Sequence, residues 1–256
     1  MGPGVRRGIA LAAGTAAFFV IAAGALFYYG ILWFVYPKSL GYDVKGIDVS
    51  MYQGEIDWSA MASQEITFAF VKATEGSGWT DPMFCANIVL SREHGVYAGA
   101  YHYFSAESPG ETQAENFVRT VSPYQMDLPP VLDFEVPAGA AAEKAALVKE
   151  VRAFLKEVEE RFGVKPVIYT TCESYDAFLA QDFGGYSLWI RDLFREPKAA
   201  GGRDWLFWQY CSRGRVAGTG GPQKYTDLDV FHGSLGEFEA YVRELSTQME
   251  TARMGA

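Results

Sequence analysis

Cysteine and basic residues are scarce in this chain, and each scarcity excludes a class of protein. The three cysteines, Cys85, Cys172 and Cys211, can form at most one disulfide, so no disulfide framework holds the fold. The sequence has no CxxC pair and no His/Cys cluster with metal-ligand spacing, and we expect neither a metal nor an organic cofactor. With 22 basic against 31 acidic residues the net charge is -9. This balance argues against nucleic acid as a partner, because phosphate binding needs basic patches.

Two catalytic signatures are also missing. No G-x-S-x-G element occurs, so we do not expect serine hydrolysis. No glycine-rich turn follows the first predicted strand, which disfavours a doubly wound, nucleotide-binding sheet. Aromatic residues, by contrast, make up 15% of the chain. That enrichment suits either a thick core or the stacking platforms that sugars need.

One long stretch has no charge at all: the 29 residues from Gly8 to Tyr36. As a helix they would extend roughly 43 Å, enough to cross a hydrocarbon core of ~30 Å. Arg6 and Arg7 precede the stretch and predict that residues 1–7 stay in the cytoplasm. The other 20 basic and all 31 acidic side chains would then lie outside a membrane that the chain spans once.

A cleaved signal peptide is the alternative, and it would make the protein secreted. Ala23-Gly24-Ala25 offers the small residues that a cleavage site needs. Cleavage there would leave residues 26–36 as an exposed apolar tail, which is costly. We therefore expect an uncleaved anchor at residues 8–36 and a folded domain at the outer face of the cell membrane.

After a linker at 37–45, the sequence alternates between strand and helix patterns. The predicted strands are apolar runs bounded by turn residues, at 46–50, 66–74, 96–104, 128–136, 166–170, 186–190, 205–210 and 226–230. The predicted helices have caps or amphipathic spacing, at 57–63, 82–94, 108–121, 138–162 and 234–249. Residues 250–256 are expected to form a frayed tail.

Eight strands with helical or irregular connections, in about 200 residues, predict an α/β fold of the barrel type. We expect a modified TIM-like β/α barrel over residues 46–249. The connections shorten in the second half of the chain, so the ring of helices should be incomplete there. A doubly wound open sheet is the alternative architecture.

Polar side chains gather at or near the predicted strand ends, where barrel enzymes place their chemistry. They are Asp48, His102, Asp133, Glu135, Tyr169, Trp189, Gln209 and Asp227. Asp133 and Glu135 lie two residues apart on one strand face, so their backbones are about 7 Å apart. Their side chains can therefore approach as the paired carboxylates of glycoside hydrolysis do. An isolated Asp-x-Glu is more often a solvated strand end, so the pair alone does not identify a site.

Eight short motifs extend this picture from about Gly46 to Gly233. They are G-I-D-V-S-x-Y-Q-G (46–54), F-V-K-A-T-E-G (70–76), G-A-Y-H-Y-F (99–104), P-V-L-D-F-E (130–135), V-I-Y-T (167–170), L-W-I (188–190), F-W-Q-Y (207–210) and T-D-L-D-V-F (226–231). In this order they resemble the glycoside hydrolase family 25 lysozymes, which are N-acetylmuramidases. Each motif alone is weak, but eight in the family's order make a specific match.

The resemblance implies a retaining enzyme that hydrolyses the β-1,4 bond between N-acetylmuramic acid and N-acetylglucosamine in peptidoglycan. It implies that Glu135 is the general acid that protonates the leaving oxygen. Asp133 would stabilise the cationic transition state, either directly as a nucleophile or by orienting the substrate's N-acetyl group. Asp48 and Asp227 match the other two carboxylates of the family's site. The implied partners are peptidoglycan glycan strands and, through the N-terminal helix, the membrane.

Asp229 departs from the family's pattern, which usually has Asn at this position. We expect it to add a negative charge near the rim, and this leaves the division of labour between Asp227 and Asp229 open. Repulsion within such a cluster should keep at least one carboxyl group protonated, and we expect that group to be Glu135.

The predicted substrate contacts are Tyr169, Trp189, His102 and Gln209. For each of them a structural role is the alternative, because aromatic side chains on strands are more often core. His102 could equally be a hydrogen-bonded core histidine. Lys72 and Glu75 are expected to form a structural ion pair.

Three other functions fit the same residues: a barrel that holds glycan without turnover, a glycosidase for chitin-like N-acetylglucosamine polymers, and a scaffold for wall-remodelling partners. Retention of all four carboxylates weighs against the first. The reducing ends of digested peptidoglycan would separate a muramidase from the second. The third predicts that removal of the carboxylates leaves the cellular phenotype unchanged.

Overall fold

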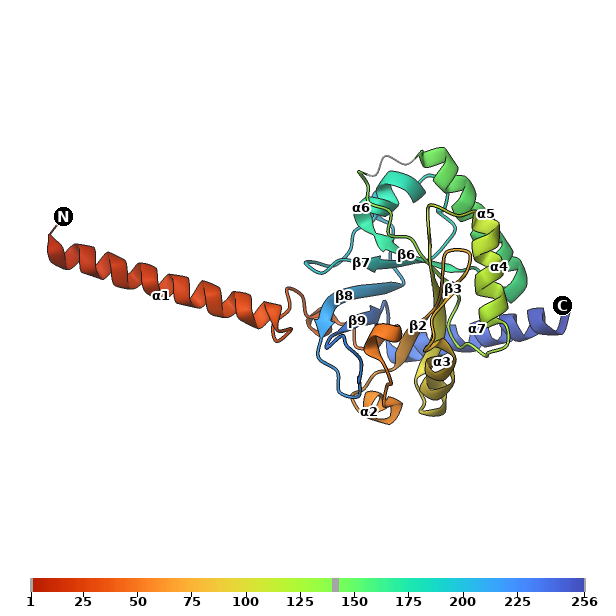
Figure 1. Cartoon of the computed structure of the whole chain (residues 1–256), viewed down its shortest axis with the longest axis horizontal. Helices are drawn as coiled ribbons and strands as arrows, with labels where there is room; N and C mark the ends of the chain where they lie inside the picture. Colours follow the sequence, from red (N-terminus) through yellow and green to blue (C-terminus); the bar gives the residue numbers. More distant parts are fainter. Residues whose placement is uncertain (1, 140–142, 256) are drawn as a thin grey trace.

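Eight strands close into a barrel in the computed structural model, which describes residues 2–139 and 143–255 (Figure 1). In ring order they are β1 (Lys45–Val49), β2 (Phe68–Glu75), β4 (Tyr97–Tyr103), β5 (Val131–Asp133), β6 (Val167–Thr171), β7 (Leu188–Arg191), β8 (Phe207–Gly214) and β9 (Thr226–Phe231). Neighbouring strands run parallel, except that β9 runs antiparallel to β8 and β1. A further short strand, β3 (Trp79–Thr80), pairs with β2 outside the ring.

The ring is closed because β1 pairs with a strand on each of its sides. Ile47 lies opposite Ala69 of β2 and opposite Leu228 of β9. This closure confirms the predicted barrel and excludes the open, doubly wound sheet. The antiparallel direction of β9 follows from its short connection to β8, because a parallel return would need a crossover of a dozen or more residues.

Alternation along each strand divides the core into two layers. Phe68 and Phe70 of β2 point into the barrel, where they pack against Phe207 and Trp189. The neighbouring residue Ala69 belongs to a second apolar cluster, between the barrel and its helices. Aromatic rings therefore fill the lower barrel, as a closed barrel of eight strands requires. The polar residues lie above this aromatic floor.

Two glycines and one helix determine where the aromatic floor lies. A Cβ atom at Gly46 would overlap the ring of Phe68, and one at Gly99 would lie 2.9 Å from the ring of Phe70. Phe238 of the last helix, α7 (Leu235–Gly255), closes the bottom of the barrel. Its ring centroid lies 5.6 Å from that of Phe68.

Helices cover the first half of the barrel and are sparse beside β7, β8 and β9 (Figure 1). In chain order they are α2 (Trp58–Ala62), α3 (Phe84–Glu93), α4 (Gly110–Val121), α5 (Lys144–Phe162), α6 (Cys172–Ser174) with the π-helical turn η3 (Tyr175–Leu179), and α7. Short 3-10 turns occur at η2 (Met51–Gln53) and η4 (Ala200–Gly202). The incomplete ring of helices is therefore confirmed.

Two predicted helices have an end that differs from the structure by more than two residues. The helix expected at 138–162 begins at Lys144, and residues 140–142 of that prediction lie outside the described ranges. Helix α7 continues to Gly255, so the frayed tail expected from residue 250 is helical as far as it is described.

Helix α1 (Pro3–Tyr28) extends away from the barrel as a single rod (Figure 1). Its most apolar 18 residues have a mean hydropathy of 2.2, and none of them is buried against the rest of the chain. The helix ends before the expected Tyr36 because Gly30 adopts a φ of 62°, and a Cβ atom there would overlap the backbone oxygen of Arg213. The chain then packs along the barrel and passes through the 3-10 turn η1 (Pro37–Leu40) to β1.

Replacement of Phe68 by Ala tests whether the aromatic floor supports the barrel. Phe68 is fully buried, so Phe68→Ala should lower the free energy of unfolding by about 3–5 kcal/mol, through lost burial and the cavity left behind. Denaturant unfolding of the full chain in detergent measures the change. The control is Leu235→Ala, at a position 51% exposed, where a change within about 0.5 kcal/mol is expected. Equal effects of the two substitutions would contradict the assigned role of the floor.

Candidate active site

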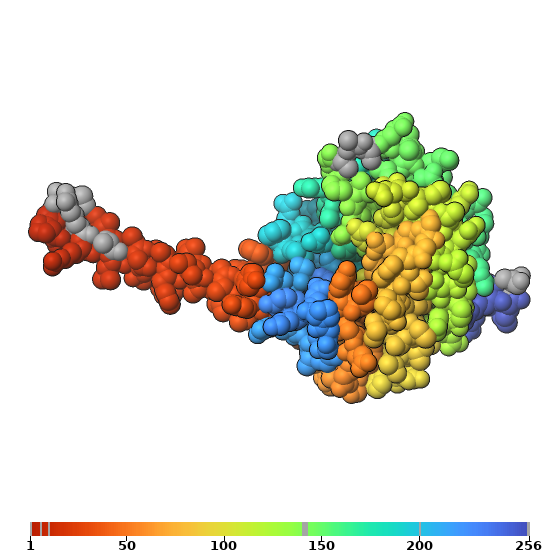
Figure 2. Space-filling model, in the orientation of Figure 1, coloured from red at the N-terminus to blue at the C-terminus, as the bar shows by residue number. Residues whose placement is uncertain are grey.

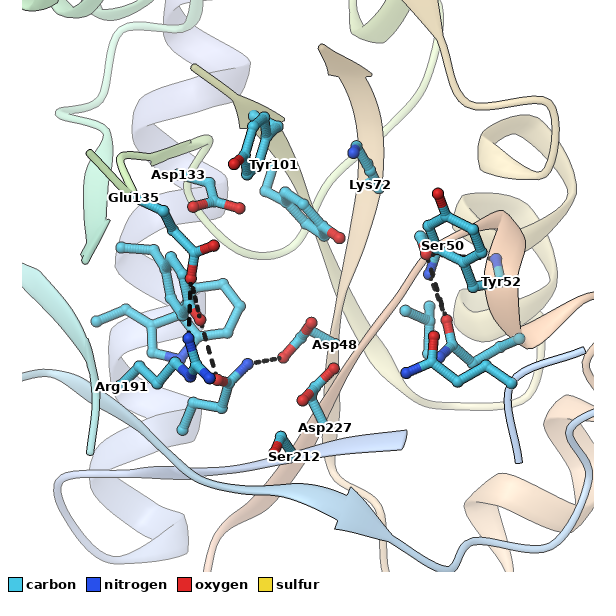
Figure 3. A pocket seen from close by; sticks show the side chains of 17 residues that line it. Asp48, Ser50, Tyr52, Lys72, Tyr101, Asp133, Glu135, Arg191, Ser212 and Asp227 are labelled. Atoms are coloured by element: carbon cyan, nitrogen blue, oxygen red, sulfur yellow. Dashed lines mark hydrogen bonds and ion pairs between the residues drawn. The ribbon is translucent and has the colours of Figure 1, made fainter. Parts of the chain in front are cut away.

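A cleft of about 270 Å³ lies above the aromatic floor, at the end toward which the parallel strands point. All four predicted carboxylates line it: Asp48, Asp133, Glu135 and Asp227. Figure 3 shows Asp133 and Glu135 on one side of the cleft and Asp48 and Asp227 on the other. Acidic side chains that are far apart along the chain therefore converge on one cavity.

Strand register brings these carboxylates together. Asp48 of β1 lies directly opposite Asp227 of β9. Asp133 is the last residue of β5, in register with Tyr103 and Tyr169 on the neighbouring strands. Glu135 lies two residues beyond the end of β5, where the chain is still extended enough that its side chain also lines the cleft.

Hydrogen bonds connect the two sides of the cleft. The hydroxyl of Tyr169 lies 2.9 Å from Gln209 Oε1 and 3.3 Å from Glu135 Oε1, so its single proton can be donated to either oxygen. Gln209 Nε2 in turn donates to Asp48 Oδ2 over 2.7 Å. A continuous chain of polar groups therefore runs from Glu135 to Asp48. A change in the charge of one carboxyl group can alter the hydrogen bonds of the other through this chain.

Two cations line the cleft among the described residues, Lys72 and Arg191. Lys72 Nζ lies 2.7 Å from Glu75 Oε2, which confirms the predicted ion pair. It also lies 4.9 Å from the ring centroid of Tyr103. Arg191 Nη1 lies 3.5 Å from Glu135 Oε1. The positive charge of Arg191 thus sits beside the outer carboxylate of the Asp133/Glu135 pair.

Burial is the main influence on the acids in this cleft. It raises the pKa of Asp133 well above its ordinary value, and the neighbouring charge of Glu135 adds to that effect. Burial likewise raises the pKa of Asp48, with Asp227 and Asp229 contributing. The pKa of Asp227 is raised to about 6, again mainly by burial. Burial therefore favours the protonated form of Asp48, Asp133 and Asp227 more than water does.

Asp229 does not lie near the rim, and that prediction is wrong. Its side chain is fully buried and does not line the cleft. Trp189 Nε1 donates to Asp229 Oδ1 over 2.8 Å, and the other oxygen, Oδ2, is buried without a hydrogen-bond partner among the described residues. The alternation of β9 places Asp229 on the same inward face as Asp227 but one layer deeper, and the sequence alone does not reveal that depth.

The surroundings of Asp229 disfavour its charged form. A buried carboxylate oxygen without a hydrogen-bond donor is costly when it carries a charge. Burial raises the pKa of Asp229 well above its ordinary value, and the charge of Asp227 adds to this. Asp229 therefore lies one layer below Asp48 and Asp227, at a position that favours the protonated acid.

His102 does not reach the cleft, and its predicted role as a substrate contact is wrong. The ring is fully buried on the outer side of β4, where Nδ1 bonds Thr74 Oγ1 at 2.8 Å and Nε2 bonds Gln113 Oε1 at 3.0 Å. It also stacks on Phe154 of α5, with centroids 4.7 Å apart. Burial lowers the pKa of His102 to about 4, so it is a neutral core residue near pH 7.

Tyr169, Trp189 and Gln209 do line the cleft. Trp189 is largely part of the wall, because one ring face stacks on Phe70 at 4.6 Å and its N–H is bonded to Asp229. Contact of these three side chains with a substrate remains a prediction.

Sequence reasoning misses Tyr101 and Arg191, both of which line the cleft (Figure 3). Arg191 lies two residues after Trp189, so strict alternation from that residue would have found it. Tyr101 alternates with His102, and the motif draws attention to the histidine, which points the other way. In both cases the signal that was missed is which alternate residues of the strand face the inside of the barrel.

The chain is similar to known proteins in sequence and in fold. The model of the family "Glycosyl hydrolases family 25" matches residues 47–219. The uncharacterized protein YegX of Escherichia coli K12 is 41% identical over 206 residues, which cover 78% of this chain and 74% of YegX. Lysozyme M1 of Streptomyces globisporus is 32% identical over 206 residues, covering 75% of this chain and 68% of the lysozyme. The structure of a family 25 glycosyl hydrolase from Bacillus anthracis aligns with a TM-score of 0.72 and 40% identity, covering 78% of this chain and 94% of that one.

Substitution of Asp229 by Asn tests its protonation through stability. Below pH 3.8, the ordinary pKa, an aspartate is protonated in the folded and the unfolded chain, so wild type and Asp229→Asn should differ by a constant amount. Above it the unfolded chain releases a proton that the folded chain keeps, so the wild type should lose stability relative to the variant. The loss amounts to about 1.4 kcal/mol for each unit by which folding raises the pKa. Unfolding measured from about pH 3 to about pH 8 gives the trend.

Asp57→Asn is the control for that trend, because it should show the opposite sign. Hydrogen bonds from Ser59 and the backbone of Ala60 lower the pKa of the exposed Asp57. The wild type should therefore gain stability relative to Asp57→Asn as the pH rises, since the folded chain releases its proton first. A stability difference between wild type and Asp229→Asn that does not change with pH would show that Asp229 ionises normally.

Proposed function

The chain belongs to glycosyl hydrolases family 25 and is a glycoside hydrolase, and from this premise we propose that its substrate is peptidoglycan. The reaction is hydrolysis of the β-1,4 bond between N-acetylmuramic acid and N-acetylglucosamine, with retention of the anomeric configuration. The observation that carries the proposal is the convergence of Asp48, Asp133, Glu135 and Asp227 on one open cleft. The likeness to Lysozyme M1 supports the choice of substrate.

Glu135 acts as the general acid. Its side chain is 30% exposed, so it can approach the oxygen of a glycosidic bond in the cleft. After Glu135 has given its proton to the leaving group, it carries a negative charge. Tyr169 and Arg191 can stabilise that charge, since both already contact Oε1.

Asp133 stabilises the cationic transition state, directly or by orienting the N-acetyl group of the substrate. Its Oδ1 is buried and has no hydrogen-bond partner among the described residues. An amide N–H of the substrate would satisfy that oxygen, and a buried acceptor left alone is costly. The same contact would favour the ionised form of a carboxyl group whose pKa burial raises.

Asp48 and Asp227 complete the acidic side of the cleft and contact the sugar opposite Glu135. Gln209 holds the Asp48 carboxyl group in place. Tyr169, Trp189 and Gln209 form the walls that the glycan touches. This arrangement uses chain groups alone for the proton transfer and the charge stabilisation.

Residues 3–28 anchor the enzyme in the cell membrane, with the N-terminus in the cytoplasm and the barrel outside. The exposed, apolar helix α1 supports this, as do Arg6 and Arg7 at its start. Several apolar residues beyond the alternative cleavage site are exposed, among them Tyr28, Ile31 and Phe34. Cleavage at residue 25 would leave these side chains in water, which is costly.

Digestion of purified peptidoglycan by the full chain in detergent tests the reaction. We expect fragments whose reducing ends are N-acetylmuramic acid, identified by mass after reduction. Glu135→Gln should lower the rate by about 10²–10⁴-fold, because it removes the acid and keeps its shape. Proton resonances of the first product should show the retained anomer.

Other products would identify the rival functions. N-acetylglucosamine at the new reducing ends would mark a chitin-type glycosidase. Binding of peptidoglycan without any product would mark a glycan-holding protein. A matched control is Glu107→Gln, an exposed glutamate that does not line the cleft, which should leave the rate unchanged.

Retention of an N-terminal tag tests the anchor. With the tag placed before residue 1, the protein in cell membranes should keep the tag and should resist extraction by alkaline carbonate, because a 26-residue apolar helix is embedded. Recovery of an untagged, soluble barrel from the medium would contradict the anchor and establish the secreted alternative.

A further inference from the structure

The anchor leaves the barrel at the end where the cleft opens. The guanidinium carbon of Arg213 lies 4.6 Å from the ring centroid of Tyr28, the last residue of α1, and equally far from that of Tyr225. Tyr225 also donates its hydroxyl to the backbone oxygen of Tyr28 over 3.4 Å. Arg213 lies near the end of β8 and follows Ser212, which lines the cleft. The end of α1 is therefore a neighbour of the rim of the cleft.

The chain then descends along the outside of β8. Trp33 packs on Tyr210 in the middle of that strand. Tyr42 packs on Trp205, just before the strand begins, with centroids 4.9 Å apart. The contacts thus move from the end of β8 to its start as the chain proceeds toward β1. This order excludes an arrangement in which α1 leaves from the floor of the barrel.

Exposed apolar side chains surround the point where α1 meets the barrel. We call Tyr28, Tyr29, Ile31, Phe34 and Phe194 the apolar collar. Phe194 belongs to the loop after β7 and is 66% exposed, and Phe34 is 59% exposed. Their ring centroids lie 5.0 Å apart. A patch of this kind in water is costly, whereas aromatic side chains are favoured at a membrane interface.

Basic side chains flank the apolar collar although the chain is acidic as a whole. Arg195 follows Phe194 directly; its Nε lies 3.5 Å from Asp192 Oδ2, but its side chain is 83% exposed and that of Asp192 only 15%. Arg213 stacks on Tyr28 of the collar itself. Figure 2 shows α1 meeting the body beside the segments that contain these residues. Such charges match the anionic headgroups of a bilayer.

We propose that the apolar collar rests in the interfacial layer of the bilayer, so that the cleft opens at the membrane-facing end of the barrel. The substrate that it reaches is then glycan lying at the membrane surface. The length of α1 agrees, because 26 helical residues extend about 39 Å and bring Tyr28 to the interface. The inference rests on the proposed function for the identity of the glycan and for the anchor.

Quenching of site-specific labels by lipid measures this orientation. A fluorophore is attached at Phe194→Cys or, as a control, at Leu235→Cys, in the full chain with Cys85→Ser and Cys172→Ser. Leu235 is comparably exposed but follows the end of the antiparallel β9, at the opposite end of the barrel. In vesicles of phosphatidylcholine and phosphatidylglycerol with a quencher on the lipid headgroup, the label at 194 should lose most of its emission. The label at 235 should lose little.

The outcomes separate this inference from the proposed function. Loss of emission at 194 alone supports the orientation, whether or not the protein hydrolyses glycan. Equal emission at both positions in vesicle-bound protein would overturn the orientation and leave the anchor and the hydrolase standing. Failure of the chain to bind vesicles would overturn the orientation and the anchor together.

A second pair of variants tests the consequence for the substrate. Phe194→Glu should lower the rate on glycan strands attached to the same vesicles several-fold, because the charge lifts the apolar collar from the bilayer. The rate on soluble glycan fragments should stay the same, since Phe194 does not line the cleft. Leu235→Glu should change neither rate. An equal loss on both substrates in Phe194→Glu would contradict the inference.

Discussion

Burial of several carboxyl groups in one layer of the barrel is the constraint on which the site depends. Asp48, Asp133 and Asp227 face the cleft, and Asp229 lies directly beneath. Lys72 and Arg191 are the two cations in the described lining, and Lys72 is already paired with Glu75. Ionisation of all these acids together would carry a large electrostatic penalty, so burial and mutual repulsion favour protonation of some of them. A site that holds protonated and ionised acids together is what acid-assisted cleavage of a glycosidic bond requires.

The aromatic floor determines the environment of the acidic layer above it. Rings of Phe68, Phe70 and Phe207 exclude water from below, and this lowers the local dielectric constant under the acids. Trp189 belongs to both layers, because it stacks on the floor and donates its N–H to Asp229. A change in the packing of the aromatic floor would therefore alter the pKa values of the acids above it.

Strand β8 connects the cleft to the N-terminal helix. It supplies Gln209 to the hydrogen-bond chain of the cleft, Ser212 to the lining of the cleft and Arg213 to the end of α1. Because these three residues lie on one short strand, the orientation of the cleft is coupled to the position of the helix. In the proposed orientation, this coupling restricts cleavage to glycan at the membrane surface.

The sequence by itself determined the barrel, the apolar N-terminal helix and the four acids that line the cleft, because periodic apolar runs and ordered motifs are local signals. Only the tertiary structure decided the depth of Asp229, the outward direction of His102 and the participation of Tyr101 and Arg191. Alternation tells which residues share a face, but the closure of the ring decides which face is the interior and how deep each residue lies. The position of the cleft relative to α1 was also decided there, because contacts such as Tyr28 with Arg213 join residues that are distant in sequence. Such contacts leave no local pattern.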